Sequence, residues 1–436
     1  MNDYSVFARR RAKLMKRMRG GVAIIPTAAE RARNRDSHYP YRFDSYFYYL
    51  TGFTEPGAVL VLVAGKKPQS ILFCRDKDRE REIWDGYRYG PQAARKRFRF
   101  DQGHSLTKLD ACMPGLLANQ PVLYYAMGND EAWDARVLGW LNQVRTQARA
   151  GISAPAEIRD LRLLLDEMRL FKDAQELTLM RRAAKISTGA HVRAMLTARP
   201  GKKEYEIEAE LLHEFRRHGA QSPAYTSIVA GGANACVLHY VENSSVLRDG
   251  DLLLIDAGCE LDGYASDITR TFPVNGKFSG VQTDIYEMVL AAQDAAIKAV
   301  KPGASWITPH DAALKVLAQG MVDLRLCKGS VSSVIESGAY QRFYMHRTGH
   351  WLGLDVHDAG DYKQEGKWRK LQAGMVLTVE PGCYVRPGKN VPQKFWNTGV
   401  RIEDDVLVTA KGHAVLTAAA PKKIADIERL MQDHAQ

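Results

Sequence analysis

The stretch that decides the fold runs from Leu252 to Phe272 and reads LLLIDAGCELDGYASDITRTF. Four apolar residues open it as a buried strand, and Asp256 follows them directly, where a carboxylate is costly unless something pairs with it. Asp267 lies eleven residues later, and the turn-like Glu260–Gly263 between the two acids predicts a hairpin. The pattern therefore predicts two carboxylates side by side at the end of a strand.

Three further residues stand in comparable surroundings. Glu380 ends the apolar run Met375–Val379, and Glu403 lies in the strand-like stretch Val400–Val408. His350 lies in the glycine-flanked sequence HRTGHWLG. A mostly oxygen ligand set with one imidazole favours manganese or a similar hard ion over a thiolate-type zinc site. Shared carboxylates can also hold two ions about 3.5–4 Å apart and generate a hydroxide for hydrolysis.

Each of these residues also has an ordinary structural interpretation. An Asp after a strand is commonly a turn former or a helix cap, and a single His is commonly structural. Taken alone, the residues indicate a carboxylate-rich metal site and leave the reaction open.

The 436-residue length and a composition of 45% hydrophobic and 25% charged residues are typical of a globular protein with two domains. Short apolar runs at 59–63, 70–73 and 121–125, with a helical pattern at 134–144, predict an α/β unit. After residue 155 the pattern is helical, at 157–170, 174–196, 284–300 and 309–324. We therefore expect an N-terminal domain at residues 1–155 and a second domain at 156–436.

Charge and cysteine content bear on partners and location. The net charge is +11, but only Arg95–Phe100 interleaves arginine with aromatics, as single-strand binders can, so we expect no nucleic-acid partner. No apolar run approaches the length of a membrane span, and no apolar segment follows the basic N-terminus as in a secretory signal. The six cysteines form no C-x-x-C pair. We expect a cytoplasmic protein with reduced thiols.

With these residues in place, the sequence resembles the Xaa-Pro aminopeptidases (aminopeptidase P) of the pita-bread metallopeptidase family. The resemblance rests on four stretches in the family's order and spacing, 255–278, 349–358, 374–382 and 399–405, and on Asp36–Phe53, which resembles the family's N-terminal domain. It implies an α/β (α+β) fold, with an N-terminal α/β domain followed by a pita-bread catalytic domain.

The resemblance also implies a set of site residues. The metal ligands would be Asp256, Asp267, His350, Glu380 and Glu403, with Asp267 and Glu403 bridging two divalent ions. His239 and His357 would contact the substrate and the reaction intermediate, and Glu380 would shuttle a proton. Three residues would assist substrate binding: Asp36, Tyr384 and Arg401. For Asp36 the alternative is a surface turn, and for Arg401 an exposed strand residue paired to Asp404 or Asp405.

The implied activity is metal-dependent release of the N-terminal residue from peptides with proline at position two, through a hydroxide that bridges the ions. Two alternatives remain: a prolidase that cleaves only Xaa-Pro dipeptides, and a pita-bread module that binds peptides without cleaving them. The family further implies a homodimer or homotetramer.

Overall fold

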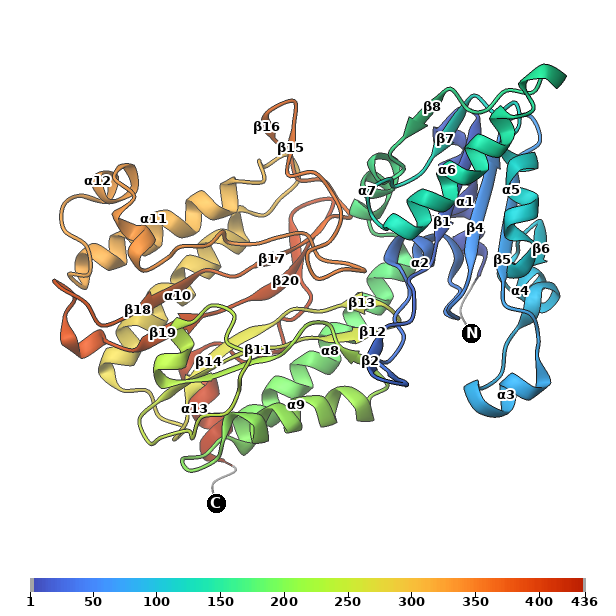
Figure 1. Ribbon diagram of the computed structural model, residues 1–436. Helices are drawn as coiled ribbons and strands as arrows, with labels where there is room; N and C mark the ends of the chain where they lie inside the picture. Colours follow the sequence, from blue (N-terminus) through green and yellow to red (C-terminus); the bar gives the residue numbers. More distant parts are fainter. Residues whose placement is uncertain (1–3, 434–436) are drawn as a thin grey trace. The chain divides into compact units, whose positions relative to one another are not determined.

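The computed structural model describes residues 4–433, which form two compact units that divide between Met168 and Arg169 (Figure 1). The division falls within helix α7 (Arg162–Leu170). The domain boundary expected between residues 155 and 156 stays a prediction.

The N-terminal unit is built on a six-stranded mixed sheet in the order β6-β5-β4-β1-β7-β8. Only β4 runs antiparallel to its neighbours, β1 and β5. The strands of the unit are β1 (Gly21–Pro26), β2 (Ala32–Asn34), β3 (Ser37–His38), β4 (Val59–Ala64), β5 (Gln69–Cys74), β6 (Gln102–Ser105), β7 (Val122–Tyr124) and β8 (Glu157–Arg159). The strands predicted from the apolar runs are confirmed, and continuous burial along β4 and β5 explains why those runs do not alternate with polar residues.

Helices cover this sheet on both faces (Figure 1). They are α1 (Ser5–Met18), α2 (Ser45–Thr51), α4 (Gly90–Phe98), α5 (Leu109–Leu117) and α6 (Glu131–Arg145). A further helix, α3 (Arg79–Asp85), buries no residue and lies away from the sheet. Leu109, Met113 and Trp140 from α5 and α6 pack in one cluster with Val22 and Ile24 of β1. The helix predicted at 134–144 is thus confirmed as α6, which begins at its Asp130 cap.

The basic segments of this unit are structural. Arg11 of α1 is buried, and its guanidinium donates to the carbonyls of Leu50 (2.8 Å), Phe98 (3.1 Å) and Arg99 (2.6 Å). Phe98 and Phe100 are also buried, so the aromatics between the arginines of Arg95–Phe100 pack in the core and present no face to a base.

One predicted helix is wrong in its first part. The sequence pattern predicted a helix over 157–170, but Glu157–Arg159 is strand β8 and the helix begins at Arg162. β8 pairs in parallel with β7 at the edge of the sheet. Hydrogen bonding to the unpaired edge of β7 therefore overrides the local helical pattern.

The C-terminal unit holds several short sheets, ordered β10-β11-β14, β13-β12-β9, β17-β20-β21 and β18-β19, with the small hairpin β15-β16. Its strands are β9 (Ser222–Pro223), β10 (Ile228–Gly231), β11 (Leu252–Asp256), β12 (Cys259–Leu261), β13 (Tyr264–Ala265), β14 (Thr269–Pro273), β15 (Lys363–Gln364), β16 (Lys367–Trp368), β17 (Val376–Val379), β18 (Gly382–Val385), β19 (Thr398–Arg401), β20 (Asp404–Val408) and β21 (His413–Val415). The predicted hairpin is confirmed as β12 and β13. Asp262 (φ 49°) and Gly263 (φ 83°) form its tight turn, which needs two positive φ angles.

Helices line the outside of these strands (Figure 1). They are α8 (Ala174–Thr197), α9 (Glu204–Arg217), α10 (Gly280–Ala299), α11 (Thr308–Asp323), α12 (Val331–Glu336) and α13 (Ile424–Gln432). α8 packs with α9 and α10 packs with α11, and both pairs contribute to one large apolar core. The helices predicted at 174–196, 284–300 and 309–324 are confirmed.

A charged network lies within this core. Arg270 is fully buried and donates to Asp404 Oδ1 (2.7 Å) and to the carbonyls of Glu403 (2.6 Å) and Ala420 (3.0 Å). The Lys422 ammonium donates to the other oxygen of Asp404 (3.0 Å). These hydrogen bonds connect the segment that carries Glu403 to the residues that precede α13, Ala420 and Lys422.

The free energy of unfolding should depend on pH because of another buried residue, His191 of α8. Its Nε2 lies 2.9 Å from the carbonyl of Ala257, and burial lowers its pKa from 6.5 to about 4. Below pH 6.5 the unfolded chain therefore binds a proton that the folded chain does not, so stability falls as the pH falls towards 4. Urea unfolding should show that wild type loses about 2 kcal/mol more than His191→Gln between pH 7 and pH 5. Equal losses in the two proteins would contradict this.

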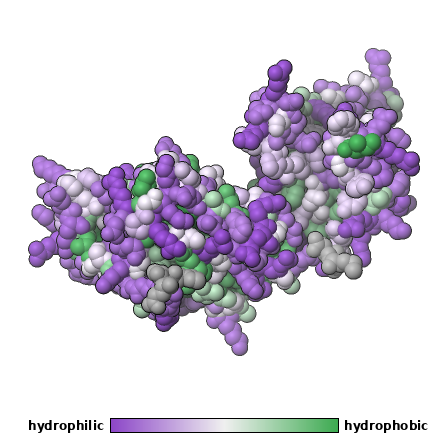
Figure 2. Space-filling model, turned by 90° about the horizontal axis from the view of Figure 1, so that it is seen from below, coloured by the Kyte–Doolittle hydropathy of each residue, from purple (hydrophilic) through white to green (hydrophobic). Residues whose placement is uncertain are grey.

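No described helix is long and apolar enough to cross a membrane. On the face drawn in Figure 2, hydrophilic residues predominate and hydrophobic ones form small separate patches.

Candidate active site

The acids predicted from the sequence meet in a pocket of the C-terminal unit. The pocket has a volume of about 260 Å³. It is lined by Leu238, His239, Asp256, His346, Arg347, Gly349, His350, His357, Glu380 and Arg401. Asp267 and Glu403 lie behind this lining, where both are buried.

Asp256 ends β11, and Asp267 follows the hairpin made by β12 and β13, as the sequence predicted. The hydroxyl of Tyr225 joins them, because it donates to Asp256 Oδ1 (2.6 Å) and to Asp267 Oδ1. The two carboxylates therefore share the single proton of one partly buried hydroxyl and lie side by side.

The predicted continuous strand over 400–408 is wrong, because Glu403 lies in a break between β19 and β20. The break occurs because β19 pairs with β18 whereas β20 pairs with β17. Thr269 Oγ1 donates to Glu403 Oε2 (2.7 Å). Because Glu403 lies outside the paired strands, its buried carboxylate can face Asp267.

His350 presents one ring nitrogen to these acids. Its Nδ1 lies 2.9 Å from the carbonyl of Trp351, a contact that requires Nδ1 to carry the proton. Its Nε2 then has a free lone pair, and it lies 3.5 Å from Asp267 Oδ2 and 3.6 Å from Glu380 Oε1. A ring held through Nδ1 with Nε2 free is the usual arrangement of a metal-binding histidine.

The carboxylates of this cluster repel one another. Burial, together with Asp256 and Asp405, raises the pKa of Asp267 well above its ordinary value. Burial, then Asp267 and Glu380, does the same for the pKa of Glu403. Ligand atoms of Asp267, His350 and Glu403 all lie within 4.8 Å of one another. A divalent cation would relieve this repulsion, so the donor set fits a metal.

Asp256 differs from the other acids because a cation already faces it. Burial alone would raise its pKa, but Arg401 and the Tyr225 hydroxyl outweigh burial and lower it. Arg401 is buried, and its Nη2 donates to Asp256 Oδ2 (2.7 Å). The alternative of an exposed Arg401 paired to Asp404 or Asp405 is therefore wrong.

A hydrogen-bonded chain runs from Asp256 to a residue that the sequence reasoning missed, His346. Arg401 Nη1 donates to the hydroxyl of buried Tyr384 (3.0 Å), which lies 2.8 Å from His346 Nε2. His346 Nδ1 faces the carbonyl of Arg347 (2.7 Å), so Nδ1 carries the proton and Tyr384 donates to Nε2. Burial, then Arg401, lowers the pKa of His346 to about 4, which keeps it neutral.

His346 could have been found from its position four residues before His350 in the same glycine-flanked stretch. Tyr225 carries no comparable signal, because it follows the two-residue strand β9 in no recognisable pattern.

His239 and His357 both line the pocket, and the His357 ring lies edge-on to His350 with ring centroids 4.3 Å apart. Asp36, by contrast, belongs to the N-terminal unit, in the exposed turn between β2 and β3. Its predicted role near the mouth of the site stays a prediction.

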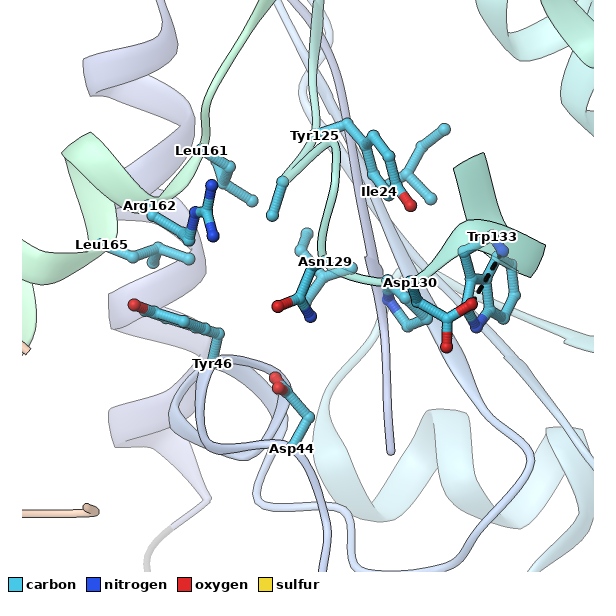
Figure 3. A pocket seen from close by; sticks show the side chains of 13 residues that line it. Ile24, Asp44, Tyr46, Tyr125, Asn129, Asp130, Trp133, Leu161, Arg162 and Leu165 are labelled. Carbon is cyan, nitrogen blue, oxygen red and sulfur yellow. Dashed lines mark hydrogen bonds between the residues drawn. The ribbon is translucent and has the colours of Figure 1, made fainter. Parts of the chain in front are cut away.

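A second, smaller hollow of about 110 Å³ lies in the N-terminal unit, where β1 and β7 end (Figure 3). Its polar side chains serve the fold. Asp44 and Asp130 cap α2 and α6, and the Tyr125 hydroxyl donates to Asp134 Oδ1 (2.9 Å). These side chains already make structural hydrogen bonds, unlike the mutually repelling carboxylates of the pocket in the C-terminal unit.

Comparison with known proteins agrees with this site. Residues 178–410 match metallopeptidase family M24, and residues 7–124 match the aminopeptidase P N-terminal domain. The chain belongs to metallopeptidase family M24, and the fold class expected from the sequence is confirmed.

Similar sequences and solved structures show which type of metallopeptidase within the family this chain is. The chain is 47% identical to the Xaa-Pro aminopeptidase of Haemophilus influenzae, over 98% of this chain and 96% of the relative. The solved structure of Pseudomonas aeruginosa aminopeptidase PepP has a TM-score of 0.98 at 49% identity, covering 100% of this chain and 99% of that one. Escherichia coli aminopeptidase P with the inhibitor Pro-Leu gives a TM-score of 0.97 at 44% identity, covering 100% and 99%. Within its family the chain is a metallo-exopeptidase of the Xaa-Pro aminopeptidase type.

Proposed function

We propose that this protein releases the first residue of peptides whose second residue is proline, using two divalent cations held by Asp256, Asp267, His350, Glu380 and Glu403. The observation that carries the proposal is the buried cluster of carboxylates around one imidazole with a free Nε2. When bound, the two cations would supply Lewis acidity at the scissile carbonyl and hydroxide at neutral pH.

Hydrolysis adds a hydroxyl to the carbonyl carbon of residue one, breaks its bond to the proline nitrogen and places a proton on that nitrogen. Glu380 is the proposed carrier of the proton from water to nitrogen, because its carboxylate lines the pocket and burial raises the pKa of that carboxyl above its ordinary value. His239 and His357 line the same pocket and would bind the substrate and the developing oxyanion.

Arg401 has a supporting role in this proposal. It keeps Asp256 ionised, and Asp256 can then bind the free α-amine and so recognise the end of the chain. Tyr384 holds both Arg401 and His346 at this wall of the pocket. Proline at position two would be favoured because its φ angle is fixed, which limits the backbone shapes that the pocket must accept.

Manganese is the proposed native metal, because oxygen donors with a single imidazole suit a hard divalent ion. The test is hydrolysis of a Xaa-Pro-Xaa tripeptide and a Xaa-Pro dipeptide by chelator-treated protein, with and without added manganese. We expect manganese to restore release of residue one from the tripeptide. Cleavage of the dipeptide alone would identify a prolidase, and turnover of neither would favour a peptide-binding module.

We also propose that the protein is a homodimer or homotetramer. Helix α3 and the residues after it expose three large apolar side chains, Ile83 (81%), Trp84 (84%) and Tyr87 (92%). Glu82 Oε1 accepts from Lys77 Nζ and from the backbone N–H of Arg88, both at 2.9 Å, so this segment is held in place when it meets a partner. Sedimentation should give a mass of two or four chains, and a monomer would contradict the proposal.

A cytoplasmic location is proposed from the thiols. The structure contains six free cysteines, of which Cys112 is partly accessible and the others are buried. Unpaired thiols are typical of proteins that stay in a reducing compartment.

A further inference from the structure

The loop from Trp351 to Asp358 carries His357 and has no regular secondary structure beyond a single bridge at Trp351. The backbone N–H of Asp358 donates to the carbonyl of Trp351 (2.9 Å) and so closes the loop. Something other than a strand or helix must therefore fix the position of His357.

A buried ionic cluster lies at the closing residue of this loop. The side chain of Asp358 is only 1% exposed, as are those of Arg169 and Lys172. Arg169 Nη2 donates to Asp358 Oδ1 (2.5 Å), and Lys172 Nζ donates to Oδ2 (2.8 Å). Arg169 Nη2 also donates to Asp355 (2.7 Å), whose side chain is 43% exposed, so the buried Arg169 and Lys172 face one buried and one partly exposed carboxylate.

The Asp358 carboxylate also contacts its own loop. Its Oδ1 accepts from the backbone N–H of Asp355 (3.3 Å). Gly353 packs so closely that an added Cβ would lie 2.2 Å from Asp358 Oδ2 and 3.0 Å from Lys172 Cε. On its other side, Gly353 accepts through its carbonyl from the N–H of Ala265 (2.8 Å), two residues before Asp267. The carboxylate therefore joins the loop to the end of α7 and to the residue that precedes the Asp173 cap of α8. Gly353 links the same loop to the hairpin that leads to Asp267.

Stability alone does not account for so many buried charges. Burial by itself would raise the pKa of Asp358, and Lys172 and Arg169 are needed to lower it. Because removing charges from water is costly, apolar side chains of similar volume are often as stabilising as a buried ion pair. An ionic cluster fixes the geometry of the segments that it joins. The neighbouring residue that benefits is His357, whose ring centroid lies 4.3 Å from that of His350.

We propose that Asp358, held by Lys172 and Arg169, is a positioning residue that fixes His357 against His350. The inference rests on the proposed function, in which His357 contacts the substrate. Asp358 itself touches neither substrate nor metal and acts only through the loop.

The test is a double-mutant cycle of Asp358→Asn and His357→Ala in the manganese-loaded protein, with kcat and KM measured on a Xaa-Pro-Xaa tripeptide. We expect Asp358→Asn to lower kcat by about 100-fold, as a misplacement near 1 Å can, while KM and metal content stay at wild-type values. The double variant should be no slower than His357→Ala alone, because a residue that acts through His357 has no effect once the imidazole is gone. Asp361→Asn, an exposed acid three residues further on, is the matched control and should leave kcat unchanged.

The other possible results distinguish a failure of the positioning role from a failure of the proposed function. Effects that multiply in the double variant, or full activity in Asp358→Asn, would overturn the positioning role and leave the proposed function intact. No tripeptide hydrolysis by wild type would overturn the proposed function and the positioning role with it. Full activity in His357→Ala would overturn the role of His357 and the positioning role, and would leave the proposed hydrolysis intact. If Asp358→Asn does not fold, Lys172→Met keeps the Arg169 contact and enters the same cycle with the same expectations.

Discussion

Glu403→Gln is expected to lower kcat/KM for a Xaa-Pro-Xaa tripeptide by about 1,000-fold or more and to reduce the bound metal. The carboxylate is buried beside Asp267 and His350, within reach of one shared ion. Metal ions supply several kcal/mol of transition-state stabilisation, and each 1.4 kcal/mol is about a factor of ten in rate. The measurements are steady-state kinetics and metal content by mass spectrometry.

The same variant has a second expected effect, opposite in sign, in chelator-treated protein. Burial and Asp267 raise the pKa of the Glu403 carboxyl, so the metal-free wild type carries a repulsion that glutamine removes. Metal-free Glu403→Gln should therefore unfold at a higher temperature than metal-free wild type. Glu336→Gln, on the surface of α12, is the matched control and should change neither quantity. Wild-type metal content and activity in Glu403→Gln would refute its assignment as a ligand.

Arg270→Met is expected to lower the free energy of unfolding of the C-terminal unit by about 3–5 kcal/mol. The guanidinium is fully buried, and its loss leaves Asp404 Oδ1 and the carbonyls of Glu403 and Ala420 without this donor. Lys422 still reaches Asp404 Oδ2, so the carboxylate keeps one cation. Urea unfolding followed by far-ultraviolet circular dichroism measures the loss.

A matched surface pair provides the control. Arg193 and Glu210 are paired at 2.5 Å on partly exposed parts of α8 and α9. Arg193→Met should cost less than about 1 kcal/mol, because water and salt screen such pairs. Equal losses in the two variants would show that burial of the Arg270 network contributes nothing.

The parts of the site that could be predicted from the sequence are those where local pattern and chemistry coincide. Asp256 follows a run of apolar residues, and the Asp262–Gly263 turn demands a hairpin, so both the strand and the pairing of the acids could be expected. The apolar run before Glu380 could be read as a strand for the same reason, and it forms β17. The family resemblance then supplied the roles that the residues alone left open.

What could not be predicted depends on partners far away in the sequence. The local pattern places Glu403 within one strand, but β19 and β20 pair with different neighbours, and no local pattern indicates those partners. Arg401 could not be placed before Asp256 was known to face it, because the two residues lie far apart in the chain. The sequence pattern of Glu157–Arg159 predicts helix, and only hydrogen bonding to the free edge of β7 makes this segment strand β8.

The proposed ligands come from segments that begin with β11 and end at the β19–β20 break, so they meet only when the C-terminal unit is complete. An ion bound there would act as a cross-link between the first and second halves of the unit. Because the unfolded chain cannot assemble the ligands, each tenfold excess of free metal over its dissociation constant would add about 1.4 kcal/mol to the free energy of unfolding. The thermal midpoint of this protein should therefore report the metal concentration of its surroundings.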